Sequence, residues 1–335
     1  MRRLVAVLLV VLAGLLAGCG GGQTETPGTS EGGEGAEKQV KLGIIQIVEH
    51  PALDAARQGF LDVLAENGYK DGENLEVDFR NAQNEQATLQ AIADKFANDP
   101  KDLILAIATP SAQAAADKTS DIPILITAVT DPVAAKLVKS MEKPGTNVTG
   151  TTDMNPIKEQ LELITKIVPD AKKIGVIYNS SEVNSQVQVN ICKEVAPELG
   201  LEIVEAPITA SSEVMQGAQS LVGKVDAIYI PTDNTVVSAC ASVIKVGEEN
   251  QIPVFAGEGN TVKSGAIATL GIDYYKLGRQ TGEMALRVLD GANPAEMPIE
   301  SQKDLKLTIN PAAAERMGVT IPEELITEDT EIIKE

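Results

Sequence analysis

Residues 40–67 read VKLGIIQIVEHPALDAARQGFLDVLAEN and contain the first unit of a repeating pattern. An apolar run, Val40–Val48, precedes a stretch from Ala52 to Asn67 in which apolar residues recur at helical spacing. Leu53, Phe60 and Leu64 fall on one stripe of that helix. Short apolar strands that alternate with longer amphipathic helices are typical of a parallel sheet covered by helices. The segment therefore predicts an α/β fold of the doubly wound kind.

The same alternation continues in two series of similar length. Further strands are predicted over residues 75–79, 103–108, 122–129, 173–178, 201–206, 227–231, 253–256 and 266–272. Helices are predicted over residues 85–98, 157–168, 182–199, 212–222, 235–249 and 274–289. The first series ends near Gly150 and the second begins at Ile157, so the pattern predicts two doubly wound, Rossmann-like lobes.

Three segments rich in Gly, Asp or Pro are predicted to cross between these lobes as a hinge. They are residues 144–156, 272–275 and 298–304. The crossings predict an N-terminal lobe of residues 39–149 plus about 274–303, and a C-terminal lobe of residues 150–273 plus about 304–335.

The chain begins MRRLVAVLLVVLAGLLAGC, which resembles an export signal. Two arginines precede an apolar run that is too short for a stable membrane span. The ending LAGC is similar to the bacterial lipobox, which implies cleavage before Cys19 and a lipid on that residue; an ordinary signal peptide with a chance cysteine is the alternative. Residues 20–38 hold no apolar cluster. We therefore predict a signal peptide (1–18), a lipid-anchored flexible tether (19–38) and an extracytoplasmic location.

Composition excludes several partners. The chain has 28 Lys+Arg against 48 Asp+Glu, a net charge of −20, which repels nucleic acid and anionic lipid head groups. No nucleic-acid partner is expected, and membrane contact is expected through the lipid anchor only.

Cys192 and Cys240 could form a disulfide, but two free buried thiols are favoured because spacing alone cannot place them within bridging reach. With one histidine, no metal site and no cofactor are expected.

Polar residues follow the predicted strands, at the edge where open parallel sheets bind ligands. The candidate ligand-binding residues are His50, Thr109, Ser111, Thr130, Asp131, Asn179, Ser180, Ser181, Asn184, Asp233, Asn234, Glu258 and Asp273. Each could instead serve as a helix cap, and for any single residue capping is favoured. Together, hydroxyls at helix N-termini suit an anion and the carboxylates Asp131, Asp233 and Glu258 suit a cation. The set therefore favours a zwitterion such as a free amino acid.

Catalytic motifs are lacking. The sequence contains neither Gly-x-Ser-x-Gly nor Gly-x-x-x-x-Gly-Lys-Ser/Thr, and His50 is the one histidine that could act as a base. No catalytic residue is predicted, and the protein is not expected to be an enzyme.

Six short segments carry a family resemblance: HPALD (50–54), TAVTDP (127–132), NVTG (147–150), GVIYNSSE (175–182), IPTDNT (230–235) and GIDYY (271–275). They resemble the tryptophan/tyrosine-type ABC transporter substrate-binding lipoproteins, and the similarity extends from Val40 to about Val319. The resemblance implies a type I periplasmic-binding-protein fold that closes by hinge bending on an aromatic amino acid, L-tryptophan, L-phenylalanine or L-tyrosine. It also implies delivery to ABC permease subunits in the membrane.

The resemblance further implies that the loops beginning at Thr109, Thr130, Asn179, Thr232 and Glu258 face the ligand. We expect a monomer. A ligand-sensing co-receptor for a membrane signalling protein and a binding protein for a different small solute are the alternatives, and an extracytoplasmic enzyme is a more distant one.

Overall fold

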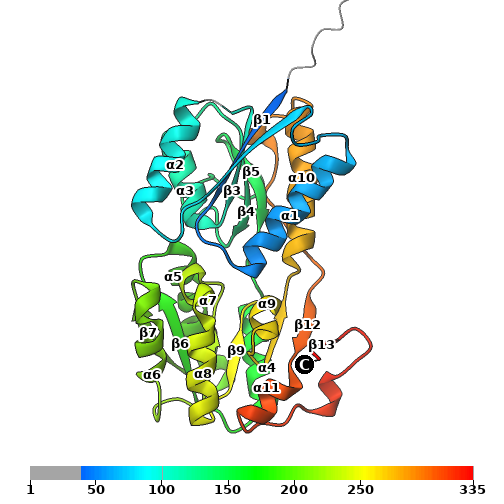
Figure 1. Ribbon diagram of the computed structural model, residues 1–335. Helices are drawn as coiled ribbons and strands as arrows, with labels where there is room; N and C mark the ends of the chain where they lie inside the picture. The colour runs from blue at the N-terminus through cyan, green and yellow to red at the C-terminus, as the bar shows by residue number, and fades with distance from the viewer. Residues whose placement is uncertain (1–38, 100, 335) are drawn as a thin grey trace, which may run out of the picture. The chain divides into compact units, whose positions relative to one another are not determined.

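The computed structural model describes residues 39–99 and 101–334 (Figure 1). The predicted signal peptide, Cys19 and the tether up to residue 38 lie outside the described residues. From β1 (Val40–Gln46) and α1 (Pro51–Glu66) onward, strands and helices alternate. The predicted α/β class is therefore confirmed.

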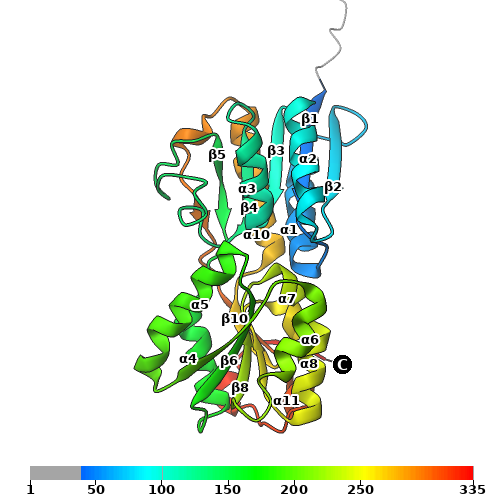
Figure 2. The ribbon, with the colours of Figure 1, turned by 90° about the vertical axis from the view of Figure 1, so that its left-hand side faces the viewer.

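The first sheet has six parallel strands in the order β11-β5-β4-β3-β1-β2. Besides β1 they are β2 (Leu75–Asn81), β3 (Leu103–Ile107), β4 (Ile124–Val129), β5 (Val148–Thr152) and β11 (Glu300–Ser301). Helices α1 and α10 (Tyr274–Leu289) pack on one face, and α2 (Gln86–Asn98) and α3 (Thr109–Lys118) on the other (Figures 1 and 2). Strands β3, β4 and β5 are buried along their whole length, as expected for a parallel sheet covered on both faces.

The second sheet has four parallel strands in the order β7-β6-β8-β9. They are β6 (Lys173–Asn179), β7 (Glu202–Ile208), β8 (Ala227–Ile230) and β9 (Val254–Ala256). Its helices are α4 (Ile157–Ile167), α5 (Val183–Val195), α6 (Val214–Gln219), α7 (Asn234–Ser238), α8 (Cys240–Asn250), α9 (Gly259–Lys263) and α11 (Pro311–Arg316). Single 3₁₀ turns occupy Ala196–Leu199, Ser211–Glu213, Pro294–Glu296 and Glu323–Leu325.

A third, mixed sheet continues the second. Its strands β10 (Ala268–Gly271), β12 (Lys306–Ile309) and β13 (Glu331–Ile332) lie in that order. The amide of Ile267 donates to the carbonyl of Val254 on β9 at 2.7 Å, which joins the two sheets.

Two apolar cores result. The first core is formed by buried residues between 42 and 148 and between 272 and 299, and the second core by those between 157 and 268 and between 309 and 317. In both parallel sheets the first strand lies between the second and the third, so each sheet has a switch point, at β1/β3 and at β6/β8. The carboxyl edge beside a switch point is where such sheets bind ligands.

The structure differs from the sequence prediction in three places. Helix α3, TPSAQAAADK, was not predicted, because its small alanines give no clear apolar stripe. The helix predicted over 235–249 is divided into α7 and α8 at Ala239, where the hydroxyl of Ser238 bonds the carbonyl of Thr235 instead of leaving it to the helix. Several short elements were also not predicted: α9, and, after the last predicted helix, β11, β12, α11 and β13.

Both cysteines of the described chain are free thiols, Cys192 buried and Cys240 half-buried.

Helices α1 and α10 approach closely through glycine. A Cβ atom on Gly59 of α1 would collide with the carbonyl oxygen of Tyr275, and one on Gly278 of α10 would collide with that of Ala56. Only glycine permits this separation of the two helix backbones. The two helices therefore form a tightly packed pair.

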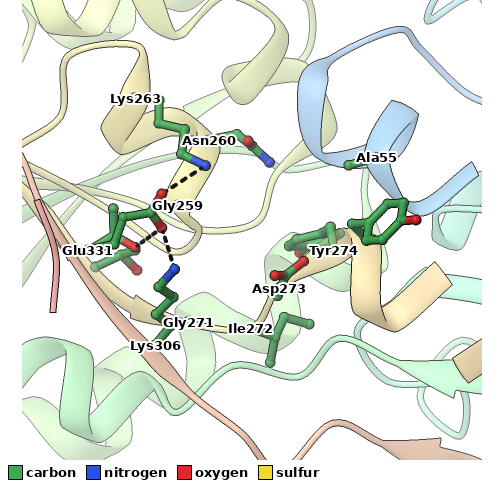
Figure 3. Close-up of a pocket in the computed structure, with 13 residues that line it drawn as sticks. Ala55, Gly259, Asn260, Lys263, Gly271, Ile272, Asp273, Tyr274, Lys306 and Glu331 are labelled. Carbon is green, nitrogen blue, oxygen red and sulfur yellow. Dashed lines mark hydrogen bonds and ion pairs between the residues drawn. The ribbon is translucent and has the colours of Figure 1, made fainter. Parts of the chain in front are cut away.

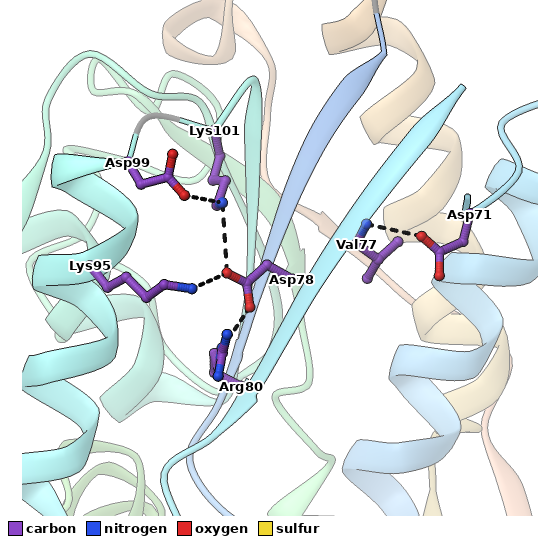
Figure 4. A network of polar contacts seen from close by, with 7 residues as sticks. All are labelled: Asp71, Val77, Asp78, Arg80, Lys95, Asp99 and Lys101. Carbon is purple, nitrogen blue, oxygen red and sulfur yellow. Dashed lines mark hydrogen bonds and ion pairs between the residues drawn. The ribbon is translucent and has the colours of Figure 1, made fainter. Parts of the chain in front are cut away.

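Strand β2 is tied to its neighbours by an ionic network around Asp78 (Figure 4). Asp78 contacts Arg80 at 2.6 Å, Lys95 of α2, and the buried Lys101 at 3.7 Å. Burial favours the neutral form of Asp78, but the bonds from Lys95 and Arg80 outweigh it and hold the pKa below its usual value. This carboxylate is thus matched by cations of the protein itself.

Candidate functional site

A pocket lies between the two cores, at the carboxyl ends of strands from both sheets. We call it the cleft pocket; it is lined by His50, Ala52, Leu53, Ala128, Thr130, Asp153, Asn184, Thr232, Asp233, Asn234, Val237, Glu258 and Tyr274. Its volume is about 20 Å³, so the lining side chains leave space for roughly one water molecule.

The backbone is strained where β3 and β4 end. Ala108 has φ 76° and Ala128 has φ 56°, in the left-handed region that alanine rarely adopts. Ala128 lines the cleft pocket, and Ala108 precedes the first turn of α3. Strained backbone of this kind is concentrated at functional sites.

His50 stands at the start of α1 but does not cap it with its side chain. Burial lowers the pKa of His50 to about 4, against a smaller opposing effect of its hydrogen bond with Asn234, so the imidazole is neutral near pH 7. Its Nδ1 atom is buried and finds no hydrogen-bond partner in residues 39–99 and 101–334. His50 and Asn234 thereby connect the first core with the second.

Asp153 follows β5 and has one oxygen engaged. Its Oδ2 accepts a hydrogen bond from the hydroxyl of Tyr274 at 2.6 Å. Its Oδ1 is buried and has no partner in the described part of the chain. Burial raises the pKa of Asp153, against smaller opposing effects of hydrogen bonding to the Tyr274 and Thr130 hydroxyls. A donor, above all a charged one, would complete this site.

Asp233 caps helix α7. Its Oδ1 accepts from the amide of Val236 at 2.7 Å, and its Oδ2 accepts from the amide of Asn179 and the hydroxyl of Ser185, each at 2.6 Å. Burial, followed by repulsion from Glu182, raises the pKa of Asp233 to about 7. Asp233 is therefore a helix cap, one of the two roles expected for it, and its side chain also lines the cleft pocket.

Glu258 has the same double position. It caps α9 by accepting from the amides of Asn260 at 2.6 Å and Thr261 at 2.7 Å, and it also bonds the Thr261 hydroxyl. Burial raises its pKa. Its side chain lines the cleft pocket from the second core.

Glu182, at the N-cap position of α5, is a buried carboxylate held by neutral groups. Its Oε1 accepts from the hydroxyl of Thr235 at 2.9 Å and the amide of Asn179 at 3.3 Å. Its Oε2 accepts from the side-chain amides of Asn234 at 2.6 Å and Asn184 at 3.1 Å. No lysine or arginine of the described chain pairs with it.

Charge distinguishes the cleft pocket from a second hollow beside it. Three carboxylates and no lysine or arginine of the described residues line the cleft pocket. The side groove, about 240 Å³ and lined partly by Asn260, Lys263, Lys306 and Glu331, contains both signs (Figure 3). There Glu331 contacts Lys263 at 3.3 Å and Lys306 at 3.2 Å, so the side groove is neutralised internally. Of these two hollows, the cleft pocket is the one whose described lining has acids and no lysine or arginine.

Ten of the predicted site residues lie at or beside the cleft. The cleft pocket contains His50, Thr130, Asn184, Asp233, Asn234 and Glu258. An adjoining polar groove of about 620 Å³, the mouth groove, contains Asn179, Ser181, Glu182 and Pro110. Thr109 and Ser111 flank Pro110 in the first turn of α3, and their buried hydroxyls have no partner among the residues that the structure describes.

The other three predicted residues lie outside the cleft pocket. Asp131 caps its own turn, accepting from the amides at 133 (3.0 Å) and 134 (2.9 Å). The Ser180 hydroxyl donates to the carbonyl of Ile208 at 3.2 Å. Asp273 caps α10 and lines the side groove. Each follows a strand or precedes a helix, so position along the chain alone could not distinguish it from the others.

Two acids of the site were not predicted as ligand-binding residues. Asp153 lies in the segment predicted as a crossover, and the signal that could have identified it is a carboxylate placed directly after the strand VTGTT. Glu182 follows Asn179-Ser180-Ser181 and is the first residue of the helix predicted over 182–199, and its burial against Asn234 and Thr235 has no signal in the local sequence.

A pocket between two parallel-sheet cores, lined by polar groups from both, is typical of type I periplasmic binding proteins. The chain belongs to the ABC transporter substrate-binding protein family, whose profile matches residues 41–333. Proteins of this family are extracytoplasmic and work with a membrane permease. In residues 39–99 and 101–334, no helix combines the length and apolarity that a membrane crossing requires.

Known relatives agree with this assignment. The chain is 50% identical over 309 residues to a protein named "Tyrosine-binding protein" from Clostridioides difficile strain R20291, covering 91% of this chain and 90% of that one. A crystal structure from Streptococcus pneumonia in complex with L-Trp has a TM-score of 0.85 at 38% identity, covering 88% of this chain and 100% of that chain. The ligand-free, open structure of a substrate-binding protein with adhesive properties from Clostridium difficile has a TM-score of 0.67 at 53% identity, covering 88% and 99%.

Proposed function

We propose that this protein captures a free amino acid with an aromatic side chain, of the tyrosine or tryptophan kind, and delivers it to an ABC permease. The observation that carries the proposal is the set of buried, unmatched polar atoms at the cleft. Asp153 Oδ1 is an acceptor suited to an ammonium group. The hydroxyls of Thr109 and Ser111, at the positive end of α3, are donors suited to a carboxylate.

Relatives support the same ligand class. One relative is named for tyrosine and one neighbour structure contains L-Trp. The chain supplies apolar side chains beside the polar ones in the cleft pocket, including Leu53, Val237 and the ring of Tyr274, against which an aromatic side chain could pack.

We further propose that the two cores are lobes that close on the ligand by hinge bending. The cleft pocket leaves about 20 Å³, too little for an amino acid to enter without separation of the cores. The chain superposes better on the L-Trp complex, at TM-score 0.85, than on the ligand-free, open structure, at 0.67, although the latter is more similar in sequence. The higher TM-score to the ligand complex is expected if the two cores of this structure lie in the closed arrangement that the ligand favours.

Titration calorimetry with a set of matched ligands tests the proposal. L-Tyrosine, L-tryptophan and L-phenylalanine are expected to bind, whereas tyramine, which lacks the carboxylate, and 3-(4-hydroxyphenyl)propionate, which lacks the ammonium group, are expected to bind far more weakly. Because the chain contains no tryptophan, indole emission in a titration comes from added L-tryptophan alone, and its blue shift reports burial. Absence of binding by all three amino acids would refute the proposal.

The proposal includes attachment to the membrane through a lipid on Cys19, since LAGC at residues 16–19 resembles a lipobox. Metabolic labelling with an alkyne fatty acid is expected to label the full chain and not the Cys19→Ser variant.

We also propose a monomer that leaves its ligand chemically unchanged. Light scattering of the chain with and without ligand tests the first point, and recovery of intact amino acid after incubation tests the second.

A further inference from the structure

In the described residues, one hydrogen bond and one further polar contact join the cores across the cleft. The side-chain amide of Asn84, in the loop after β2, donates to the hydroxyl oxygen of Thr235 on α7 at 3.1 Å. The imidazole of His50, at the start of α1, bonds the side chain of Asn234. Both acceptor residues belong to the second core and are adjacent in sequence.

Both acceptors are oriented by one carboxylate. Thr235 donates its hydroxyl hydrogen to Glu182, so that the two lone pairs of its oxygen accept from Asn84 of the first core and from Asn179 of the second. Asn234 donates its amide nitrogen to Glu182, so that its carbonyl oxygen is left for His50. Without Glu182, the Thr235 hydroxyl could rotate its hydrogen toward the Asn84 amide, which is also a donor, and the Asn234 amide could flip its NH2 group toward His50.

Glu182 can orient both side chains because its two carboxylate oxygens carry no hydrogen and only accept hydrogen bonds. It receives four hydrogen bonds from neutral side chains of the second core, it is buried, and no cation of the described residues competes for it. A side chain with any donor hydrogen would conflict with at least one of these four donors.

We propose that Glu182 is a positioning residue for closure: it fixes Asn234 and Thr235 as acceptors toward the first core and thereby sets how much of the protein is closed. The inference rests on the proposed function, because it concerns closure on the amino acid. Glu182 itself need not touch the ligand.

The test compares Glu182→Gln with Glu205→Gln. Glu205 lies on β7, bonds Tyr178 and Lys193, and lines neither the cleft pocket nor the mouth groove, so it controls for loss of a carboxylate. Glu182→Gln is expected to weaken L-tyrosine binding about 10- to 100-fold, as for loss of hydrogen bonds to a charged group. In small-angle scattering it is also expected to reduce the contraction on saturation with L-tyrosine. Glu205→Gln is expected to change neither.

A compensating substitution distinguishes lost orientation of Asn234 from general disruption of the buried cluster around Glu182. Adding Asn234→Asp to Glu182→Gln exchanges amide and carboxylate, so that a donor again faces an acceptor at this contact. We expect the double variant to regain part of the lost affinity and contraction, because the Asn184 donor on the same side of residue 182 still faces the introduced amide. A structural role without orientation predicts no recovery, because the second substitution only adds change to the buried cluster.

Each result decides the matter. If wild type neither binds nor contracts with any aromatic amino acid, the proposed function fails. If wild type does so and Glu182→Gln behaves like Glu205→Gln, this inference fails while the function stands. If Glu182→Gln does not fold, as judged by circular dichroism, Asn84→Asp in the half-buried loop of the first core replaces it. That substitution sets a carboxylate against the oriented Thr235 oxygen and must weaken binding, and unchanged binding would overturn the inference.

Discussion

Two groups of carboxylates in this protein have opposite surroundings. At the outer edge of the first sheet, Asp78 is in contact with three cations of the protein (Figure 4). In the cleft, no lysine or arginine of the described residues pairs with the buried acids Asp153, Glu182 and Asp233. The first acid has its counter-charges within the fold, whereas the others are held by neutral hydrogen-bond donors.

This difference in surroundings predicts that Asp78 contributes to the stability of the fold and that the acids of the cleft contribute to ligand binding. A carboxylate that is paired in the folded state favours folding, and removal of its charge leaves its cations unpaired. A carboxylate that is buried without a cation opposes folding and favours any ligand that supplies positive charge. Substitutions at the two places should therefore affect different measurements.

The largest effect is expected at Asp153. Asp153→Asn keeps an acceptor for Tyr274 but removes the charge that faces the cleft, so L-tyrosine should bind roughly 100- to 1,000-fold more weakly. The free protein should unfold at the same temperature or higher, because a buried unmatched charge is lost. Calorimetric titration and thermal unfolding measure the two quantities. Asp131→Asn, in a capped turn outside the cleft pocket, is the matched control and should bind as wild type does.

His50 should give a smaller effect that depends on pH. Its pKa is about 4 in the folded protein and near 6.5 when unfolded, so the unfolded chain takes up the proton first. This contribution to stability is complete above about pH 6.5 and falls by about 3 kcal/mol as the pH drops to about 4. Urea unfolding of wild type and His50→Gln across that range should show a difference that grows toward low pH. A constant difference would contradict the buried, neutral imidazole.

Asp78→Asn should act on stability alone. Lys101, which is buried, would lose one of its two carboxylate partners among the described residues and retain Asp99, and a loss of about 2 kcal/mol in the free energy of unfolding is expected. Urea unfolding measures it, and L-tyrosine affinity should not change. Asp99→Asn, on the exposed side of the same lysine, is the control and should change stability less. A change in ligand affinity for Asp78→Asn would remove the distinction between the two carboxylate groups.

The smallest effect is expected at Ser111. Its hydroxyl is buried without a partner in the part of the chain that is described, so Ser111→Ala should change the free energy of unfolding by no more than about 0.5 kcal/mol. If the hydroxyl receives the ligand carboxylate, affinity should fall about tenfold. Equal affinity with unchanged stability would place the carboxylate elsewhere in the cleft.

The sequence predicted the fold class and much of the site's position for one reason. Parallel strands present their carboxyl ends at one edge, so His50, Thr130 and Asp233, each just after a strand, could be expected to meet there. The structure brings these three into one pocket. Asp131, adjacent to Thr130, turns away to cap its own backbone, and sequence position could not distinguish the two.

Features that depend on contacts distant in sequence could not be predicted. Asp153 is held at the cleft by its hydrogen bond with Tyr274, 121 residues away. Glu182 is held by the donors at 234 and 235, more than 50 residues away. Helix α3 was missed because alanine carries little apolar signal, although its first turn holds two of the predicted hydroxyls.

The glycine contact between α1 and α10 has a mechanical consequence. With Gly59 and Gly278 leaving no room between the two backbones, neither helix can slide or tilt without the other. Helix α10 begins at Tyr274, next to a passage of the chain between the cores, and α1 begins at Pro51, directly after His50. A rotation at that passage would therefore move both helix starts together, and a bulkier residue at either glycine would separate the helices and shift the part of the pocket wall that they supply, His50 included, relative to Asn234.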